Sequence, residues 1–211
     1  TYLKDKGQVA TGWQTIDGIQ LYFDGTGKQI KGERILIDGK YYYFDKNSGE
    51  LLRNAFHSFS SSYKLYFGND GAQVFGWYTL DGHRVYFKED GIQAKDKVLS
   101  IDGNYYYFNQ DGQLLVNGSA KSYNSLYLAD SEGKLLSGWR EIDGKTYYLD
   151  PSEKHYYYNR TASIDGKTYL FGSYAELLRN DTNYAYASDE NGIVRTGFYR
   201  TDKGYLCYLE P

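Results

Sequence analysis

The sequence predicts an all-β fold, an elongated β-solenoid of stacked β-hairpins that are about 20 residues long and grouped three to a block of about 60. A repeated phrase, recurrent Asp-Gly pairs and an unusual composition predict it. The phrase opens at Gly12-Trp13, Gly76-Trp77 and Gly138-Trp139, with a weaker copy at Gly197-Phe198. The 26 Tyr and 24 Gly against 2 Pro favour many short strands joined by tight turns. Such an array repeats one surface along its length, which suits a long and repetitive ligand.

Asp-Gly pairs predict most of the hairpins. Both residues tolerate the positive φ that a two-residue hairpin turn requires at its central positions. Strand-like runs flank each pair, as residues 34–37 and 40–44 flank Asp38-Gly39. The pairs are Asp17-Gly18, Asp38-Gly39, Asp81-Gly82, Asp102-Gly103, Asp143-Gly144 and Asp165-Gly166.

The remaining hairpins are predicted from weaker strand patterns. Residues 55–59 face residues 64–67. Residues 120–123 face residues 125–128, and residues 201–204 turn the last hairpin.

The whole chain, residues 1–211, is predicted to be a single repeat array. Its blocks span approximately residues 12–75, 76–137, 138–196 and, as a partial copy, 197–211. The stretch 174–188 departs most from the repeat, and we expect an irregular or shortened hairpin there.

The alternation of side chains along each strand separates two faces. The set predicted to form the core is Ile16, Leu21, Phe23, Ile37, Tyr42 and Phe44. The opposite set, predicted to lie on an outward face, contains Tyr22, Tyr41 and Tyr43. A lone hairpin is barely stable, whereas stacked hairpins bury a continuous seam. The three Trp residues of the repeated phrase are interpreted as packing residues of this seam rather than as ligand platforms.

Charge and composition restrict the partners. A net charge of −3 argues against nucleic acid or an anionic membrane as a partner. No apolar run approaches the ~20 residues that span a bilayer, so we predict no membrane insertion. Cys207 is the one cysteine, which fits an exported bacterial protein as well as a cytosolic one. Because the chain starts at Thr1 without Met, we expect a piece of a longer protein. We also expect a monomer that is secreted and that can associate with a bacterial cell surface.

The Gly-rich segments between hairpins, here called connectors, resemble calcium loops only faintly. Residues 24–29 and 130–134 are examples, and none of the connectors has the acid ladder and terminal Glu of an EF-hand. The histidines His57, His83 and His155 share no spacing that predicts a metal site. Plain turns are therefore predicted, with no metal and no cofactor.

The motif Gly-Trp-x-x-Ile-Asp-Gly, followed by aromatic residues and a Gly-rich connector, resembles the cell-wall-binding and choline-binding repeats. It is most similar to the glucan-binding repeats of glucansucrases (dextransucrases and relatives), and clostridial toxin tails share the pattern. The resemblance runs from about Gly7 to Tyr208. It implies hairpins that wind as a superhelix, and a module that binds carbohydrate.

Local residues favour glucan over choline. A cage rich in Trp suits a quaternary ammonium, and this chain has three Trp in all. The resemblance associates sugar pockets with a stacking Tyr and a Gln-x-Lys motif on the connector. The chain has Gln29-Ile30-Lys31 and Gln93-Ala94-Lys95 in matching places, whereas the third block puts Tyr157 where Lys would stand.

Two sugar pockets are predicted on this basis. A Tyr ring covers the apolar face of a glucosyl ring, while Gln offers a donor and an acceptor and Lys offers donors. Gln and Lys two residues apart on an extended connector point to the same side. The first predicted pocket contains Tyr22, Gln29, Lys31 and either Tyr41 or Tyr43. The second contains Tyr86, Gln93, Lys95 and either Tyr105 or Tyr107.

A catalytic role for the chain itself is not predicted. A glycoside hydrolase needs two carboxylates across the scissile bond, whereas most acids here stand at turns. No Gly-x-Ser-x-Gly motif, phosphate loop or CxxC is present. The resemblance implies that a parent protein would be a glucansucrase, a glucosyltransferase that uses sucrose. The alternatives are a choline or teichoic-acid anchor, a toxin-type receptor-binding repeat, and an array that only spaces two domains.

Overall fold

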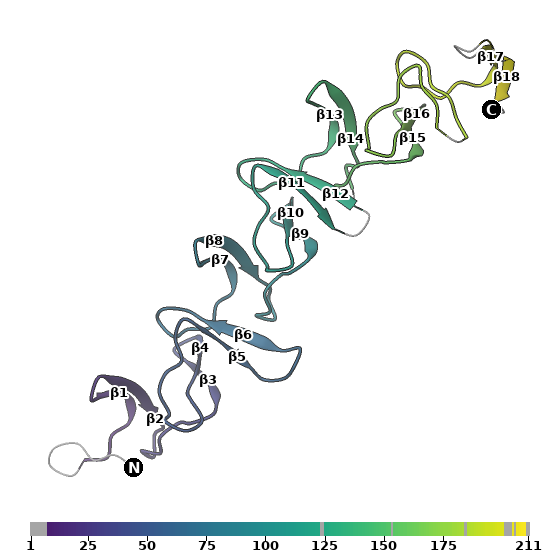
Figure 1. The fold of residues 1–211 in the computed structure, drawn as a ribbon. Helices are drawn as coiled ribbons and strands as arrows, with labels where there is room; N and C mark the ends of the chain where they lie inside the picture. The colour runs from purple at the N-terminus through teal and green to yellow at the C-terminus, as the bar shows by residue number, and fades with distance from the viewer. Residues whose placement is uncertain are drawn as a thin grey trace. The chain divides into compact units, whose positions relative to one another are not determined.

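The chain folds as a series of two-stranded antiparallel hairpins (Figure 1). The computed structural model describes residues 8–122, 125–152, 154–183, 185–200, 204 and 206–209. Within these residues every named element is a strand that pairs with its neighbour in sequence. The predicted all-β hairpin repeat is therefore confirmed. No helix of the described residues is long and apolar enough to cross a membrane.

The chain divides into two compact units, Thr1–Lys95 and Asp96–Pro211. The strands of the first unit are β1 Gly12–Ile16, β2 Ile19–Phe23, β3 Arg34–Ile37, β4 Lys40–Tyr43, β5 Ala55–Ser58, β6 Lys64–Phe67, β7 Gly76–Leu80 and β8 His83–Phe87. Those of the second are β9 Lys97–Ile101, β10 Asn104–Phe108, β11 Gly118–Ser122, β12 Ser125–Ala129, β13 Gly138–Ile142, β14 Lys145–Leu149, β15 Arg160–Ile164, β16 Lys167–Phe171, β17 Gly197–Arg200 and β18 Leu206–Leu209. The predicted 60-residue blocks describe the sequence repeat and remain a prediction.

Each predicted Asp-Gly pair forms a hairpin turn. Asp38 has φ 48° and Gly39 has φ 79°, and the other pairs share this double left-handed conformation. The three weaker hairpins also form, as β5–β6, β11–β12 and β17–β18. Tyr123, which the sequence predicts in a strand, and residues 201–203 of the last predicted turn lie outside the described residues.

The segment between β16 and β17 is irregular, as the sequence predicts. Its described residues form isolated bridges such as Thr182 to Ala187 and Ser188 to Val194, in place of paired strands. The departure from the repeat motif there corresponds to the loss of a full hairpin.

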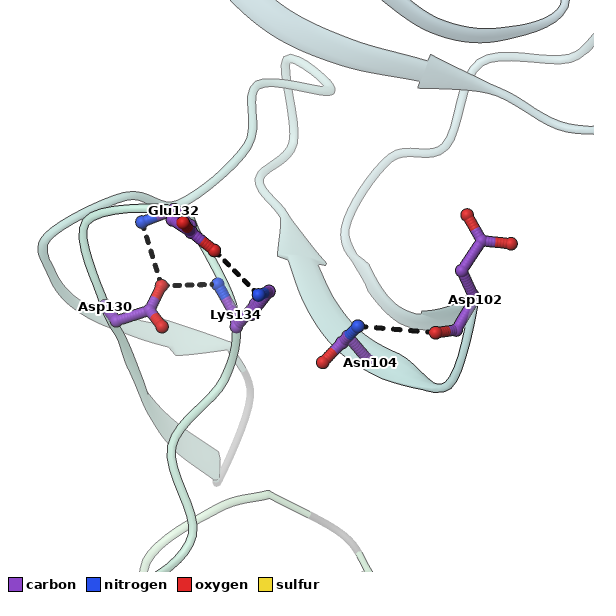
Figure 2. A network of polar contacts seen from close by, with 5 residues as sticks. All are labelled: Asp102, Asn104, Asp130, Glu132 and Lys134. Carbon is purple, nitrogen blue, oxygen red and sulfur yellow. Dashed lines mark hydrogen bonds and ion pairs between the residues drawn. The ribbon is translucent and has the colours of Figure 1, made fainter.

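Connectors that begin with Asp share one turn chemistry. Asp130 Oδ1 accepts the backbone N–H groups of Glu132 and Lys134, both at 2.9 Å, as Figure 2 shows. Asp45 Oδ1 accepts those of Asn47 and Ser48 in the same way. Local side-chain bonds of this type stabilise a turn in place of a strand. The leading Asp of these connectors therefore organises backbone.

The β3–β4 hairpin is covered on both faces by its neighbours, which corrects one prediction. Phe44 is fully buried with Ile37 and contacts the preceding hairpin, where the ring centroid of Trp13 is 5.6 Å away. Tyr43 points to the opposite face but is only 6% exposed, because Leu65 of the following hairpin packs on it. The prediction that Tyr43 lies on an outward face is wrong. In a stack, alternation separates two packed faces rather than a core face from a solvent face.

Tyr22 departs from the prediction for the same reason. It is the cross-strand partner of Trp13, the two ring centroids being 5.2 Å apart, and it packs with Phe44 of the next hairpin. The interpretation of Trp13 as a packing residue agrees with this arrangement. Trp139 likewise meets Tyr148 and Phe171.

The connectors lock successive hairpins together. The Leu51 N–H donates to the Gln20 carbonyl of the preceding hairpin at 3.0 Å. The Leu51 side chain lies on Gly71 of the next connector, where an added Cβ would stand 2.6 Å from Leu51 Cδ2. Gly71 also has φ +77°, so both its backbone and its neighbour require glycine. This connector is therefore held between its two neighbours by the packing of Leu51.

Candidate functional site

An aromatic groove of about 540 Å³ lies near the turn end of β3–β4, within the first unit. Its walls come from the turn and first residues of β4, from the connector between β6 and β7, and from the start of β7. The residues that matter for ligand chemistry are Lys40, Tyr41, Gln73, Phe75, Trp77 and Tyr78. Phe75 is 45% exposed, so the groove carries an apolar edge open to solvent.

Gln73 forms the polar floor of this groove. It is 7% exposed, and its Oε1 accepts a 2.7 Å hydrogen bond from Arg34 Nε. Its buried Nε2 has no hydrogen-bond partner among the described residues. This nitrogen packs against Gly91 of the next connector, where an added Cβ would stand 2.1 Å from it, so Gln73 serves the groove by holding Arg34.

Cations of the chain itself cover two of the aromatic rings. The Arg34 guanidinium carbon lies 3.6 Å from the centroid of Tyr41. The Arg84 guanidinium carbon lies 4.4 Å from the ring centroid of Trp77. Arg34 Nε donates to Gln73 Oε1, and the two terminal nitrogens of its guanidinium group can donate further hydrogen bonds to a ligand. The groove thus combines ring surface, a positive charge and amide chemistry.

The first predicted pocket is not assembled as expected. Gln29 Nε2 donates to the Ser48 carbonyl at 3.0 Å, and Lys31 Nζ donates to the Asn47 carbonyl at 2.9 Å. The two side chains point to the same side, as predicted, and they contact the next connector. Tyr22 packs on Trp13 instead of standing beside them.

The two tyrosines predicted as alternatives for the first pocket, Tyr41 and Tyr43, lie in different environments. Tyr43 is buried and stacks on the ring of His57 at 3.6 Å, where burial lowers the pKa of His57 below its ordinary value. Tyr41 is half-buried and lines the aromatic groove described above.

The residues of the second predicted pocket belong to two units. In the first unit Tyr86 meets Trp77 edge-on at 5.2 Å, Gln93 is 8% exposed and Lys95 is exposed. In the second unit Tyr105 is half-buried with Lys154 Nζ at 5.0 Å from its ring centroid, and Tyr107 is 4% exposed. The burial of Tyr107 leaves it no ring face for a sugar.

The bridging register shows which connector residues are equivalent, and it corrects the third block. In each of these bridges a connector residue pairs with the last residue of the hairpin before it. The pairs include Phe23–Gln29, Phe67–Gln73, Phe87–Gln93 and Leu149–Tyr156. Tyr156 therefore takes the Gln place, and Tyr158, not Tyr157, takes the Lys place. The Tyr157 hydroxyl instead donates to Asp150, and burial is the main cause that raises the pKa of Tyr157 to about 12.

Sequence reasoning missed Gln73 and Trp77 as groove residues. Gln73 stands at the same connector position as Gln29 and Gln93, but Phe75 replaces the Lys that completes their motif. The recurrence of Gln at that position was a signal that could have found it.

A second groove of about 480 Å³ lies beside the first in the same unit. Its aromatic residues are Phe56, Tyr66 and Tyr78, and it also contains Asn54 and Asp81. Tyr66 is 5% exposed, and burial is the main cause that raises its pKa above the ordinary value. Among the described residues no Lys or Arg lies over these rings.

Comparisons with known proteins agree with this architecture. The model of the choline-binding repeat matches residues 10–56 and 74–119, and that of the putative cell wall binding repeat matches residues 137–154. Over 98% of its length the chain is 41% identical to Glucosyltransferase-S of Streptococcus mutans, and it spans 12% of that protein.

Solved structures show the same fold. The choline-binding domain of CbpL from Streptococcus pneumoniae is 25% identical with a TM-score of 0.59, over 88% of this chain and 97% of that domain. CbpF of the same organism is 21% identical with a TM-score of 0.67, over 90% of this chain and 73% of that one.

These matches define the class of protein: a non-catalytic binding module made of hairpin repeats. The chain belongs to the cell-wall-binding and choline-binding repeat family, and its repeats are similar to those of streptococcal glucosyltransferases.

Proposed function

We propose that the chain binds α-glucan, such as dextran or isomaltooligosaccharides, and keeps the polymer near the catalytic domain of a parent glucosyltransferase. The module would act outside the cell, on or near a bacterial surface. Relatives that are glucosyltransferases and match nearly the whole chain support this proposal.

The positions of Arg34 and Arg84 at the groove favour a neutral sugar over choline as the ligand. A quaternary ammonium binds to an open aromatic face. At the groove the faces of Tyr41 and Trp77 already have Arg34 and Arg84 at 3.6 and 4.4 Å. A second cation there would meet like charge, whereas a sugar hydroxyl can accept a hydrogen bond from Arg34.

Two modes of sugar contact follow. In the groove, a glucosyl ring would contact the aromatic side chains while its hydroxyls reach Arg34 and Gln73. At Gln29 and Lys31, a sugar would have to replace the connector carbonyls of Ser48 and Asn47 that these side chains now contact. Because both carbonyls are backbone groups at an exposed turn, water can satisfy them after the exchange.

Repetition would supply the affinity. A shallow polar groove competes poorly with water, so each site is expected to be weak. Several weak sites on one chain that bind one polymer gain through effective concentration. Long glucan should therefore bind far more tightly than a short oligomer.

One observation favours a second candidate, a choline or teichoic-acid anchor. The groove formed by Phe56, Tyr66 and Tyr78 combines aromatic rings with the carboxylate of Asp81, and no described cation covers these rings. That chemistry suits a quaternary ammonium.

Affinity electrophoresis of the chain through dextran-containing gels tests the proposal. We expect retardation by dextran, no effect of free choline, and reduced retardation for Tyr41→Ala with an unchanged melting temperature. Retention on a choline resin together with free migration through dextran would establish the second candidate instead. Phe56→Ala is the matched variant, since it should impair only choline retention.

A further inference from the structure

A pocket of different chemistry lies around Asp96 in the second unit. Asp96 has φ 44° just before β9, and its N–H donates to the Asn109 carbonyl at 2.9 Å. Asn117 and Asn159 hold the same position before β11 and β15, with φ 45° and 49°. Their N–H groups donate to connector carbonyls in the same way. Because Asn adopts the same left-handed conformation at the equivalent positions, the turn does not require a charged residue at position 96.

The Asp96 carboxylate is fixed by two hairpins. The Tyr107 hydroxyl of β10 donates to Asp96 Oδ1 at 3.1 Å, and the Ser122 hydroxyl of β11 donates to the same oxygen at 2.8 Å. No described residue donates to the other oxygen, Oδ2. A carboxylate that is held rigid through one oxygen keeps the second for a ligand.

The carboxylate faces a cavity of about 420 Å³, a volume within the range of ligand pockets. The residues that line it include Asp96, Tyr107, Asn109, Gln110, Lys121 and Ser122. Lys121 and Gln110 are exposed, so their side chains can move toward a bound molecule. The Tyr107 ring is buried and stacked on Tyr127, with centroids 4.9 Å apart, so it presents its hydroxyl and not its face.

We infer that this pocket is a carbohydrate subsite that binds the hydroxyl edge of a sugar without an aromatic platform. The inference rests on the proposed function, because it takes the ligand to be the same neutral glucan. A hydroxyl can donate to Asp96 Oδ2 while it or its neighbour accepts from Lys121 or Gln110. Two adjacent hydroxyls of a glucosyl ring present this combination of donor and acceptor.

Asp96→Asn removes the charge with little change in shape, and Asn117 and Asn159 show that Asn fits the backbone conformation. Asp102→Asn is the matched control. Asp102 also has a left-handed φ, of 49°, and its backbone carbonyl accepts from Asn104, a contact that the substitution keeps (Figure 2).

The test is calorimetric titration of the whole chain with isomaltotriose, beside Tyr41→Ala, which removes the aromatic groove. We expect Asp96→Asn to weaken one class of sites about tenfold, in line with a hydrogen bond to a charged group. Asp102→Asn should bind as the parent does, and Tyr41→Ala should keep the class that Asp96→Asn loses. Lys121→Ala, an exposed substitution, should weaken the same class, and it decides the matter if Asp96→Asn fails to fold.

The outcomes separate the two proposals. If Tyr41→Ala loses binding while Asp96→Asn and Lys121→Ala titrate like the parent, the Asp96 subsite is wrong and the glucan function stands. If the parent gives no binding heat with isomaltotriose and no retardation by dextran, the proposed function and the subsite both fail.

Discussion

The two ends of each hairpin differ although both repeat in sequence. At the connector end Phe44, Phe67 and Phe87 are fully buried. At the turn end of β3, Leu36 is 59% exposed, and Tyr41 across the hairpin lines a groove. Regularity at the connector end thus reflects packing between neighbours, whereas regularity at the turn end leaves side chains available to a ligand. A repeated motif alone therefore does not identify a binding surface.

Phe44→Ala is expected to have the largest effect. Removal of a fully buried aromatic side chain should lower the free energy of unfolding by about 3–5 kcal/mol, because the neighbouring hairpins cannot close the cavity. Denaturant titration followed by circular dichroism measures it. Leu36→Ala, at the turn end, should change stability by less than about 0.5 kcal/mol. Equal losses for the two variants would remove the distinction between the ends.

Two glycine substitutions separate packing at the connector from backbone strain at the turn. Gly71 and Gly39 have φ +77° and +79°, but an added Cβ at Gly71 stands 2.6 Å from Leu51 Cδ2 while Gly39 has open space. Gly39→Ala should cost about 1–2 kcal/mol from backbone strain alone. Gly71→Ala should cost about 2–4 kcal/mol, because Leu51 is buried and cannot move aside. Thermal melts of both variants give the values, and a smaller loss for Gly71→Ala would contradict the packed connector.

The double variant Gln29→Ala with Lys31→Ala tests the connector as a sugar site. We expect a few-fold weaker retardation by dextran, since the variant loses the predicted Gln-x-Lys contacts and keeps the aromatic groove. Stability should fall only slightly, because both side chains bond carbonyls at an exposed turn. If the double variant migrates in dextran like the parent, Gln29 and Lys31 stabilise the neighbouring connector and do not bind sugar.

The loss of stability at acid pH caused by protonation of Asp45 is the smallest expected effect. Backbone N–H groups of Ser48 and Asn47 that donate to Asp45 hold the pKa of this carboxyl below its ordinary value. A lowered folded pKa contributes stability above about pH 4 that is lost as the pH falls through the folded value. The melting temperature should therefore drop below about pH 4, and Asp45→Asn should make that drop shallower. Asn109 occupies the same place in its connector, so the substitution fits the turn.

The hairpins were predictable because their signal is local. Asp-Gly turns and strand patterns act within about 20 residues, and every such pair forms its predicted turn. The site was less predictable because it depends on which faces the neighbouring hairpins cover. Strand alternation placed Tyr43 outward, but the following hairpin buries it. The Gln-x-Lys motif correctly predicted that Gln29 lies on the connector. It could not show that the Gln29 amide donates to the Ser48 carbonyl of the next connector.

A crystal of the chain soaked in isomaltotriose would show whether glucan binds at the turn-end groove. We expect glucosyl density at the turn-end groove, against Tyr41 and within hydrogen-bond distance of Arg34 or Gln73. A groove that stays empty at millimolar isomaltotriose while dextran still retards the protein would contradict the proposed site.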